Sequence, residues 1–254
     1  MKPTAPVSGG PCWAELGTTD VDGAKTFYTR LFGWLAETDT REQAGGYTVA
    51  RLGDAPVAAL TPLFDPSHPV AWNVSFSVTD AEACLRAVRH AGGTRLLGPM
   101  EVFDLGRFAV IADPDGAVLQ LWEPGTFPGA GVLDVPGALG WVELLTGAPE
   151  QAVAFYTTVF GWSVDTSGPR PRWSIGGAGF GGMTAVDEKF PPEVPSHWLP
   201  YFAAEDVDGT AEAAARGRGT VLMEPTAVPG GPRVAVLRDP QGAVFGVYAA
   251  SHER

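Results

Sequence analysis

The chain is poor in the residues that build disulfide frameworks and small metal-binding modules. Its 254 residues include two cysteines, Cys12 and Cys84, and four histidines. Two cysteines cannot make a disulfide framework, and neither their spacing nor their neighbours resemble a metal clip. The sequence therefore excludes the disulfide-rich folds and the cysteine-rich metal-binding folds.

Long hydrophobic runs and positive charge are also scarce. No apolar run reaches the ~20 residues of a membrane-spanning helix, and the N-terminus lacks a basic stretch followed by a hydrophobic one. We therefore expect a cytoplasmic protein without a membrane partner. The 29 acidic and 17 basic residues give a formal net charge of −12. Such a surface repels phosphate backbones, so we expect no nucleic-acid partner.

What the sequence does contain is a long internal repeat. A hydrophobic content of 45% with eight tryptophans is typical of a globular protein. The repeated positions include, first copy before second, Trp13 and Trp141, Glu15 and Glu143, Tyr28 and Tyr156, Trp72 and Trp198, Asp113 and Asp239. A shared register of this length indicates two copies of one domain. Each copy is long enough to bury a core of its own.

Each copy contains the same pattern of strands and helices twice. In the first copy, residues 12–18 alternate as a half-buried strand, and a helix capped by Asp20 runs through Phe32 to Gly33. The further predictions are strands at 34–40, 46–52, 56–62 and 73–78, a helix at 81–91, and strands at 94–99, 106–112 and 117–123. The sequence therefore predicts an α+β fold with four βαβββ modules, at 10–64, 70–124, 138–187 and 196–250. Residues 125–137 are the linker between the domains 10–124 and 138–250.

Strand alternation predicts which side chains lie on the face of each sheet that the helices do not cover. The purely apolar strand faces should lie under the helices; they are Cys12, Ala14 and Leu16 in one strand and Val74, Phe76 and Val78 in another. The opposite faces carry Trp13, Glu15, Asn73, Ser75 and Ser77. These side chains should therefore point into a cleft, while Trp72 and Trp198 point the other way.

The paired modules, the Phe-Tyr pair in the first helix and the Asp-Pro-Asp-Gly hairpin before the last strand resemble the vicinal oxygen chelate superfamily. That superfamily includes glyoxalase I, extradiol dioxygenases, fosfomycin-resistance enzymes and bleomycin-binding proteins. The resemblance covers nearly the whole chain, and it is closest to the tandem-domain actinomycete branch labelled glyoxalase-like or "hydroxylase". It implies that each domain folds two modules into a U-shaped eight-stranded sheet around one cleft.

In catalytic members of that superfamily, His, Gln or Glu side chains on the first strands and the last strand hold a divalent metal. The matching positions here are Trp13, Asn73 and Gln120 in the first copy, and Trp141, Leu199 and Gly246 in the second. Indole cannot ligate a metal, and amide oxygens alone are poor ligands. We therefore predict that neither cleft holds a catalytic metal, and we expect no cofactor.

The cleft faces instead predict a site for an organic ligand. The candidate ligand-binding residues are Trp13, Asn73, Ser75, Gln120 and Trp122 in the first copy, and Trp141, Leu199, Tyr201 and Tyr248 in the second. Aromatic walls suit a planar, mostly apolar molecule that a few polar groups orient. The alternative is that these rings pack against one another and fill the space. The first cleft is the more polar and favours chemistry, whereas the second favours apolar binding.

Two glutamates are the candidate catalytic residues. Glu15 and Glu143 each follow a cleft tryptophan by two residues, so both should face the cavity. A partly desolvated carboxyl group has a raised pKa and can act as a general acid or base. It can equally anchor a cationic amine or a ligand hydroxyl. The plainer alternative is a buried glutamate bonded to a neighbouring hydroxyl, to Arg107 or to Arg233.

Two functions from different classes fit this sequence. The first is a metal-independent binder of a bulky aromatic or polycyclic natural product or antibiotic, in sequestration, self-resistance or biosynthesis. The second is a metal-free isomerase, cyclase or lyase of secondary metabolism that uses a cleft glutamate as general acid–base. Because the metal-ligating side chains are missing, the sequence disfavours a metal-dependent glyoxalase or dioxygenase. Because a tandem chain can pair its modules internally, both a monomer and a homodimer are open.

Overall fold

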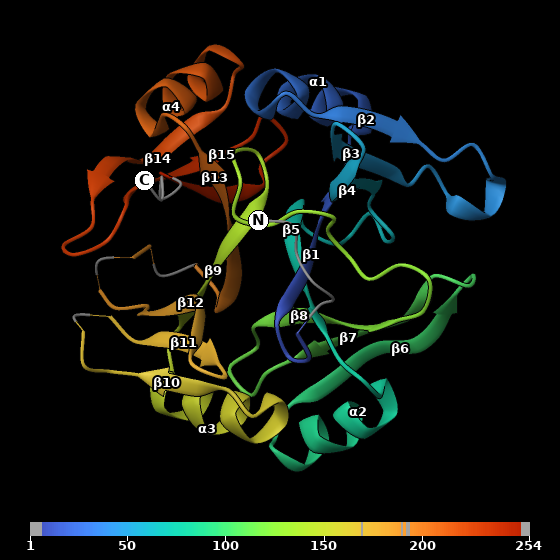
Figure 1. Cartoon of the computed structure of the whole chain (residues 1–254), viewed down its shortest axis with the longest axis vertical. Helices are drawn as coiled ribbons and strands as arrows, with labels where there is room; N and C mark the ends of the chain where they lie inside the picture. Colours follow the sequence, from blue (N-terminus) through green and yellow to red (C-terminus); the bar gives the residue numbers. More distant parts are fainter. Residues whose placement is uncertain (1–6, 169, 189, 192–193, 250–254) are drawn as a thin grey trace.

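The computed structural model describes residues 7–168, 170–188, 190–191 and 194–249. The chain forms two eight-stranded sheets, one from each copy of the repeat (Figure 1). The first copy contains β1 (Pro11–Thr18), α1 (Val21–Phe32), β2 (Leu35–Thr38), a 3-10 turn (Glu42–Ala44), β3 (Thr48–Leu52), β4 (Ala55–Pro62), β5 (Ala71–Ser77), α2 (Ala81–His90), β6 (Thr94–Val102), β7 (Gly106–Ala112) and β8 (Val118–Pro124). The second contains β9 (Leu139–Thr146), α3 (Pro149–Phe160), β10 (Ser163–Asp165), β11 (Arg172–Ile175), β12 (Ala178–Ala185), β13 (His197–Ala204), α4 (Val207–Arg216), β14 (Thr220–Ala227), β15 (Arg233–Arg238) and β16 (Val244–Ala249).

The strand order confirms the predicted α+β fold of four βαβββ modules. The first sheet has the order β2-β3-β4-β1-β5-β8-β7-β6, and the second repeats it as β10-β11-β12-β9-β13-β16-β15-β14. Within each module the last strand pairs in parallel with the first strand, as β4 does with β1 and β8 with β5. The two modules of a sheet meet where β1 runs antiparallel to β5, and β9 to β13.

The first helix begins and ends where its sequence signals indicated. Asp20 caps α1, because its carboxylate accepts a hydrogen bond of 2.9 Å from the Gly23 backbone N–H. Gly33 ends the helix in the left-handed conformation (φ 71°), with its N–H bonded to the Thr29 carbonyl. Between these two ends, α1 buries Phe27 and Tyr28.

The face prediction for β1 is wrong at one residue. Ala14 and Leu16 lie under the helices as expected, but Cys12 packs with Trp13 on the opposite side of the sheet. The register between β1 and β5 shifts between Pro11 and Trp13. A bulge of this kind inserts one residue and breaks the two-residue alternation of side chains.

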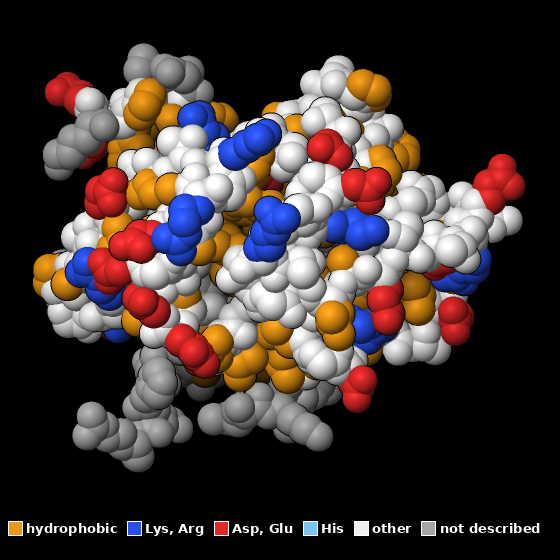
Figure 2. Space-filling view, turned by 90° about the horizontal axis from the view of Figure 1, so that it is seen from above, with side chains coloured by type: hydrophobic (Ala, Val, Ile, Leu, Met, Phe, Trp, Pro, Cys, Tyr) orange, Lys and Arg blue, Asp and Glu red, His pale blue; other side chains and the backbone are white. Residues whose placement is uncertain are grey.

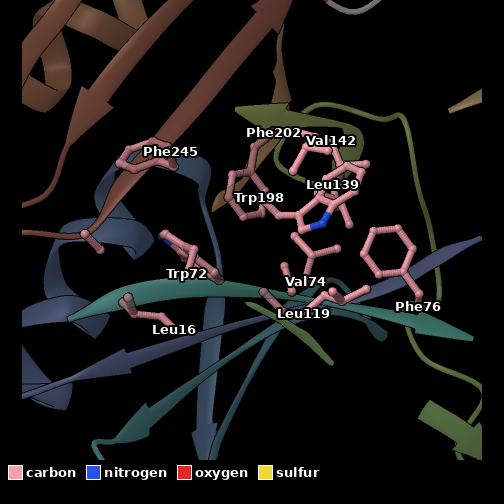
Figure 3. Close-up of a cluster of buried hydrophobic side chains, with 14 of the residues drawn as sticks. Leu16, Trp72, Val74, Phe76, Leu119, Leu139, Val142, Trp198, Phe202 and Phe245 are labelled. Atoms are coloured by element: carbon pink, nitrogen blue, oxygen red, sulfur yellow. The ribbon is translucent and has the colours of Figure 1, made fainter. Parts of the chain in front are cut away.

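The two sheets share one core, although each copy is long enough to bury a core of its own. The helix-covered faces of the sheets pack against each other, with β5 next to β13, α1 next to α4 and α2 next to α3 (Figure 1). Figure 3 shows Trp72 and Phe76 of the first copy facing Trp198 and Phe202 of the second. Trp72 and Trp198 thus lie in the shared core, on the other side of the sheet from Glu15 and Asn73, as predicted. The second copy therefore buries the apolar face that the first copy leaves uncovered.

Two series of hydrogen-bonded side chains cross this shared core. Trp198 Nε1 donates to the Tyr156 hydroxyl at 2.9 Å, and that hydroxyl donates to Asp113 Oδ2 of the other copy at 3.0 Å. The counterpart joins Trp72, Tyr28 and Asp239, at 2.9 Å for each bond. Asp113 also forms the predicted turn, since its Oδ1 accepts from the Ala117 N–H at 2.9 Å. The repeated Tyr and Asp motifs therefore hold the two domains together.

Candidate functional site

Each sheet has a second face, turned away from the helices, on which the predicted site residues lie. We call them the first open face, which carries Trp13, Glu15, Asn73, Ser75, Gln120 and Trp122, and the second open face, which carries Trp141, Glu143, Leu199, Tyr201, Gly246 and Tyr248. On the first face, strand pairing aligns Trp13 with Ser75, Glu15 with Asn73, and Ser75 with Gln120. The three central strands therefore bring together residues that are far apart in sequence.

The first open face centres on Glu15. Burial raises the pKa of this carboxyl group, and hydrogen bonding with Tyr47 and Gln120 partly offsets the rise. The Tyr47 hydroxyl also accepts a bond of 3.0 Å from Trp13 Nε1, while burial and the adjacent Glu15 charge raise the pKa of Tyr47. Ser75 Oγ donates to Gln120 Oε1 at 2.7 Å. The result is a connected polar network flanked by the two tryptophans of the face.

The second open face holds its glutamate differently. Trp141 Nε1 donates to one carboxylate oxygen of Glu143 at 3.0 Å, and Thr184 Oγ1 donates to the other at 2.7 Å. Burial raises the pKa of Glu143, and these two bonds, followed by the charge of Arg170, act against the rise. Tyr201 packs directly over Gly246, where a Cβ would overlap its ring. The Tyr248 hydroxyl donates to Asp134 in the linker.

The sequence prediction missed Tyr47 and Arg170. The strand pairing makes these two residues equivalent. Ala59 pairs with Glu15 and Val49 in the first sheet, and Gly182 pairs with Glu143 and Arg172 in the second. Tyr47 and Arg170 each precede the matching strand residue, Val49 or Arg172, by two positions. The loop that contains Gly45-Gly46 is shorter in the second copy, so the spacing between repeated positions changes after the first helix. This change of spacing hides the match in the sequence. Aligning the third and fourth strands of the two copies separately would have found it.

Each glutamate is bonded to neighbouring hydroxyls, as one of the alternatives proposed. The arginine version of that alternative is wrong. Arg107 pairs with Glu82, Glu101 and Glu123, and Arg233 pairs with Asp208. Both arginines lie on strands next to the sheet edges, β7 and β15, whereas the glutamates lie on central strands. Among the described residues, neither Glu15 nor Glu143 forms a salt bridge with an arginine, and Arg170 acts on Glu143 through its charge.

The donor atoms on the open faces do not fit an inner shell for a divalent metal. In the described part of the chain, no three His, Cys, Asp or Glu residues are grouped as metal ligands. Each face supplies one carboxylate, and the neighbouring Trp side chain offers an N–H donor and no lone pair. Gln120 Oε1 already accepts from Ser75. The side chains present thus suit hydrogen-bonding and stacking chemistry.

The two faces expose different kinds of side chain. Trp13 and Trp122 are only 5% and 7% exposed, and their rings pack against Phe127, as the space-filling alternative describes. On the second face Trp141 and Tyr201 are partly exposed, whereas on the first face the partly exposed side chains are Glu15 and Asn73. The exposed part is therefore aromatic on the second face and polar on the first.

Two hollows in the described surface lie elsewhere. One, of about 800 Å³, lies between α1 and α4, and its lining includes Arg30, Arg216 and Arg218. Figure 2 looks onto this side and shows basic side chains around a depression with hydrophobic side chains inside it. A smaller hollow of about 210 Å³ lies beside the turn between β6 and β7. Neither hollow contains a predicted site residue.

Paired modules around an open, polar-and-aromatic sheet face define a tandem protein of the glyoxalase fold. The model of the Glyoxalase/Bleomycin resistance protein/Dioxygenase superfamily matches residues 12–121 and 138–247. The chain therefore belongs to that superfamily. In the described residues, no helix is long and apolar enough to cross a membrane.

Similar proteins include two curated groups. The chain is 39% identical over 245 residues to "Putative glyoxylase CFP32" of Mycobacterium bovis, with 94% of each chain covered. It is 38% identical over 257 residues to "Anthracycline biosynthesis protein DnrV" of Streptomyces peucetius, with 94% of this chain and 92% of that one covered. The chain is thus a glyoxalase-fold protein with relatives named for antibiotic biosynthesis.

Solved structures support the fold. The 2,3-dioxygenase LapB from Pseudomonas sp. KL28 superposes with a TM-score of 0.69 at 14% identity, covering 98% of this chain and 94% of that one. The Mn(II)-bound glyoxalase from Novosphingobium aromaticivorans gives a TM-score of 0.68 at 15% identity, covering 97% and 83%. At this level of identity the match extends to the fold alone.

Proposed function

We propose that this protein binds a bulky, largely aromatic natural product or antibiotic on its open faces without a metal. The role is sequestration, self-resistance or assistance in biosynthesis. The observation that carries the proposal is the pairing of an indole with a desolvated carboxyl group on each face, at and beside the positions of the family's metal ligands. Flat apolar molecules bind by stacking on such rings, while one carboxyl group can orient a hydroxyl or amine.

The second open face is the one whose aromatic rings are the more exposed to such a ligand. Trp141 and Tyr201 are partly exposed, and both adjoin Glu143, whose carboxylate Trp141 and Thr184 hold in place. Arg170 adds a positive charge near this carboxyl group and near Tyr201. The face thus offers aromatic area together with both signs of charge. The names of the relatives in anthracycline biosynthesis support a polycyclic ligand.

A fluorescence titration tests the proposal. The probe is 2-hydroxyanthraquinone, a flat tricycle whose single hydroxyl cannot chelate a metal with its carbonyls. We expect saturable quenching of tryptophan emission and about tenfold weaker binding in Trp141→Ala, which corresponds to about 1.4 kcal/mol. Phe64→Ala is the matched control, because Phe64 is 84% exposed. Absence of saturable quenching, or equal loss in the control, would contradict the proposal.

The second candidate function is a metal-free isomerase, cyclase or lyase. It is favoured by Glu15, whose raised pKa and bonding to Tyr47 suit a group that moves a proton. The test is incubation of the bound aromatic compound with the protein, followed by mass spectrometry and chiral chromatography. Conversion that Glu15→Gln abolishes, with binding retained, supports this function. Recovery of unchanged ligand supports sequestration.

A further inference from the structure

A segment of the interdomain linker runs across the first open face. Residues 125–131, here called the strap, are tied to both modules of the first domain. On one side, the Phe127 N–H donates to the Leu105 carbonyl at 3.1 Å. On the other, the Ala130 N–H donates to the Cys12 carbonyl at 2.8 Å, and the Gly131 N–H to that of Pro56 at 2.7 Å. The strap therefore bridges β1 and β4 to the loop before β7.

The strap lies so close to the sheet that glycine is needed along it. Gly129 has a φ of 113°, and a Cβ there would overlap the Cys12 carbonyl oxygen. A Cβ on Gly131 would lie 2.9 Å from Pro56 Cδ, and one on Gly125 2.6 Å from the Asp104 carbonyl oxygen. Side chains would therefore lift the strap, and its sequence is suited to lying flat.

Phe127 is the one aromatic side chain of the strap, and its ring sits between the two tryptophans of the face. Its centroid lies 5.0 Å from that of Trp13, edge to face, and 6.1 Å from that of Trp122. Trp122 Nε1 donates to the Phe127 carbonyl at 2.8 Å. Leu105 and Phe108 pack against the same cluster. We call this apolar space, filled by the Phe127 ring, the Phe127 seat.

We propose that the Phe127 seat is a binding subsite for one aromatic ring of the ligand, which Phe127 occupies until the ligand displaces it. This inference rests on the proposed function, and it extends that function to the face that the strap covers. A ring in the seat would contact Trp13, whose indole N–H bonds Tyr47, and Tyr47 in turn bonds Glu15. A hydroxyl on that ring would therefore come near the most polar group of the face.

The strap is held by bonds that water can replace. Most of them join backbone groups, and one joins the Trp122 indole N–H to the Phe127 carbonyl. Gly125, Thr126 and Pro128 of the strap are exposed, and Phe127 itself is partly exposed. Displacement therefore exchanges one aromatic ring for another on the same two indoles, and water or the ligand then takes over the bonds of the Cys12 carbonyl and the Trp122 N–H. Because an occupied seat reduces the fraction of binding-competent protein, the ring of Phe127 should weaken the apparent affinity of the ligand.

The direct test places 4-fluorophenylalanine at position 127 of the full chain and follows its ¹⁹F resonance. We expect a resonance shifted by the neighbouring indoles, which moves to the solvent-exposed position when 2-hydroxyanthraquinone is added. Saturable quenching with an unmoved ¹⁹F resonance would overturn the subsite while leaving the proposed function in place.

Two variants test the same subsite by affinity. Phe127→Ala empties the seat, and Gly129→Ala lifts the strap while keeping the ring; we expect each to tighten probe binding by about tenfold. Gly116→Ala is the control for left-handed strain, since Gly116 has a φ of 94° and nothing within 4 Å of a Cβ. Weaker binding in both strap variants would overturn the inference.

A smaller probe separates the two proposals. Toluene fits a space left by one benzyl side chain, and apolar cavities of that kind bind such molecules. We expect NMR-detected toluene binding to Phe127→Ala and none to the wild type. If no variant binds the tricycle but Phe127→Ala binds toluene, the proposed function fails and the seat stands. If Phe127→Ala binds neither, the seat fails.

Discussion

At the scale of single residues, the two copies use one side chain in two ways. Trp13 donates its indole N–H to a tyrosine, which bonds the glutamate, whereas Trp141 donates directly to the glutamate. The repeat predicts both Trp-x-Glu pairs, because two-residue spacing on a strand puts them on one face. It does not reveal that Tyr47 bonds Glu15 or that the charge of Arg170 acts on Glu143, because both residues precede strands whose repeat offset differs between the copies.

The pH dependence of stability should carry the signature of Glu143. Because burial raises the folded-state pKa of this carboxyl group, the native state holds more protons than the unfolded state above about pH 4.3. Stability should therefore fall as pH rises from there to the folded-state pKa, by about 1.4 kcal/mol per unit of raised pKa. Glu143→Gln should remove this fall. Urea unfolding of both proteins between pH 4.5 and 8 measures the difference, and identical slopes would refute it.

The two thiols should be unreactive in the native protein. Burial raises the pKa of Cys12 and of Cys84 to about 12. Since the thiolate is the reactive form, a disulfide reagent at pH 8 should modify both thiols within minutes in denaturant and neither in the native state. Rapid reaction of one thiol in the native protein would show that its part of the core opens readily.

At the scale of elements, sequence patterns predict the helices and strands well, because caps, stops and alternation are local. The bulge at Cys12 is not local, since it depends on how β1 pairs with β5 sixty residues away. The strap is likewise hidden, because a Gly- and Pro-rich segment reads as a simple linker. What holds Phe127 on the first open face are backbone bonds of the strap to distant strands and loops and the contacts of its ring with two tryptophans.

Packing between two central strands should make Gly246 intolerant of a side chain. A Cβ there would overlap the Tyr201 ring, so Gly246→Ala should destabilise the fold by about 1–3 kcal/mol. Gly179→Ala in the same sheet is the control, because its nearest neighbour would be 3.9 Å away. Chemical denaturation of both variants tests this. Equal stabilities would mean that Tyr201 can move aside freely.

At the scale of the whole molecule, the two copies share one core. The repeat predicts two domains, yet repetition alone says nothing about which faces meet. The shared core shows which faces meet, since the ring centroids of Phe76 in the first copy and Trp198 in the second lie 5.2 Å apart. The repeated tyrosines and aspartates contribute through bonds that cross between the copies. The copies are therefore domains by sequence that share one hydrophobic core.

Breaking one crossing bond should weaken both halves together. Tyr156→Phe removes the hydroxyl that joins Trp198 to Asp113, and it leaves two buried polar groups without that partner. We expect a loss of about 2–4 kcal/mol, with one unfolding transition retained. Calorimetry measures both quantities. Two separate transitions in the wild type would show that the domains are independent.

The central claim is that indole and carboxyl groups on the open faces hold a flat organic molecule without a metal. Native mass spectrometry of the protein mixed with 2-hydroxyanthraquinone, after exhaustive treatment with a chelator, tests it most directly. The account predicts an adduct with the mass of the intact ligand and no metal, lost in the double variant Trp13→Ala and Trp141→Ala. An adduct that forms only when a divalent metal is restored would contradict it.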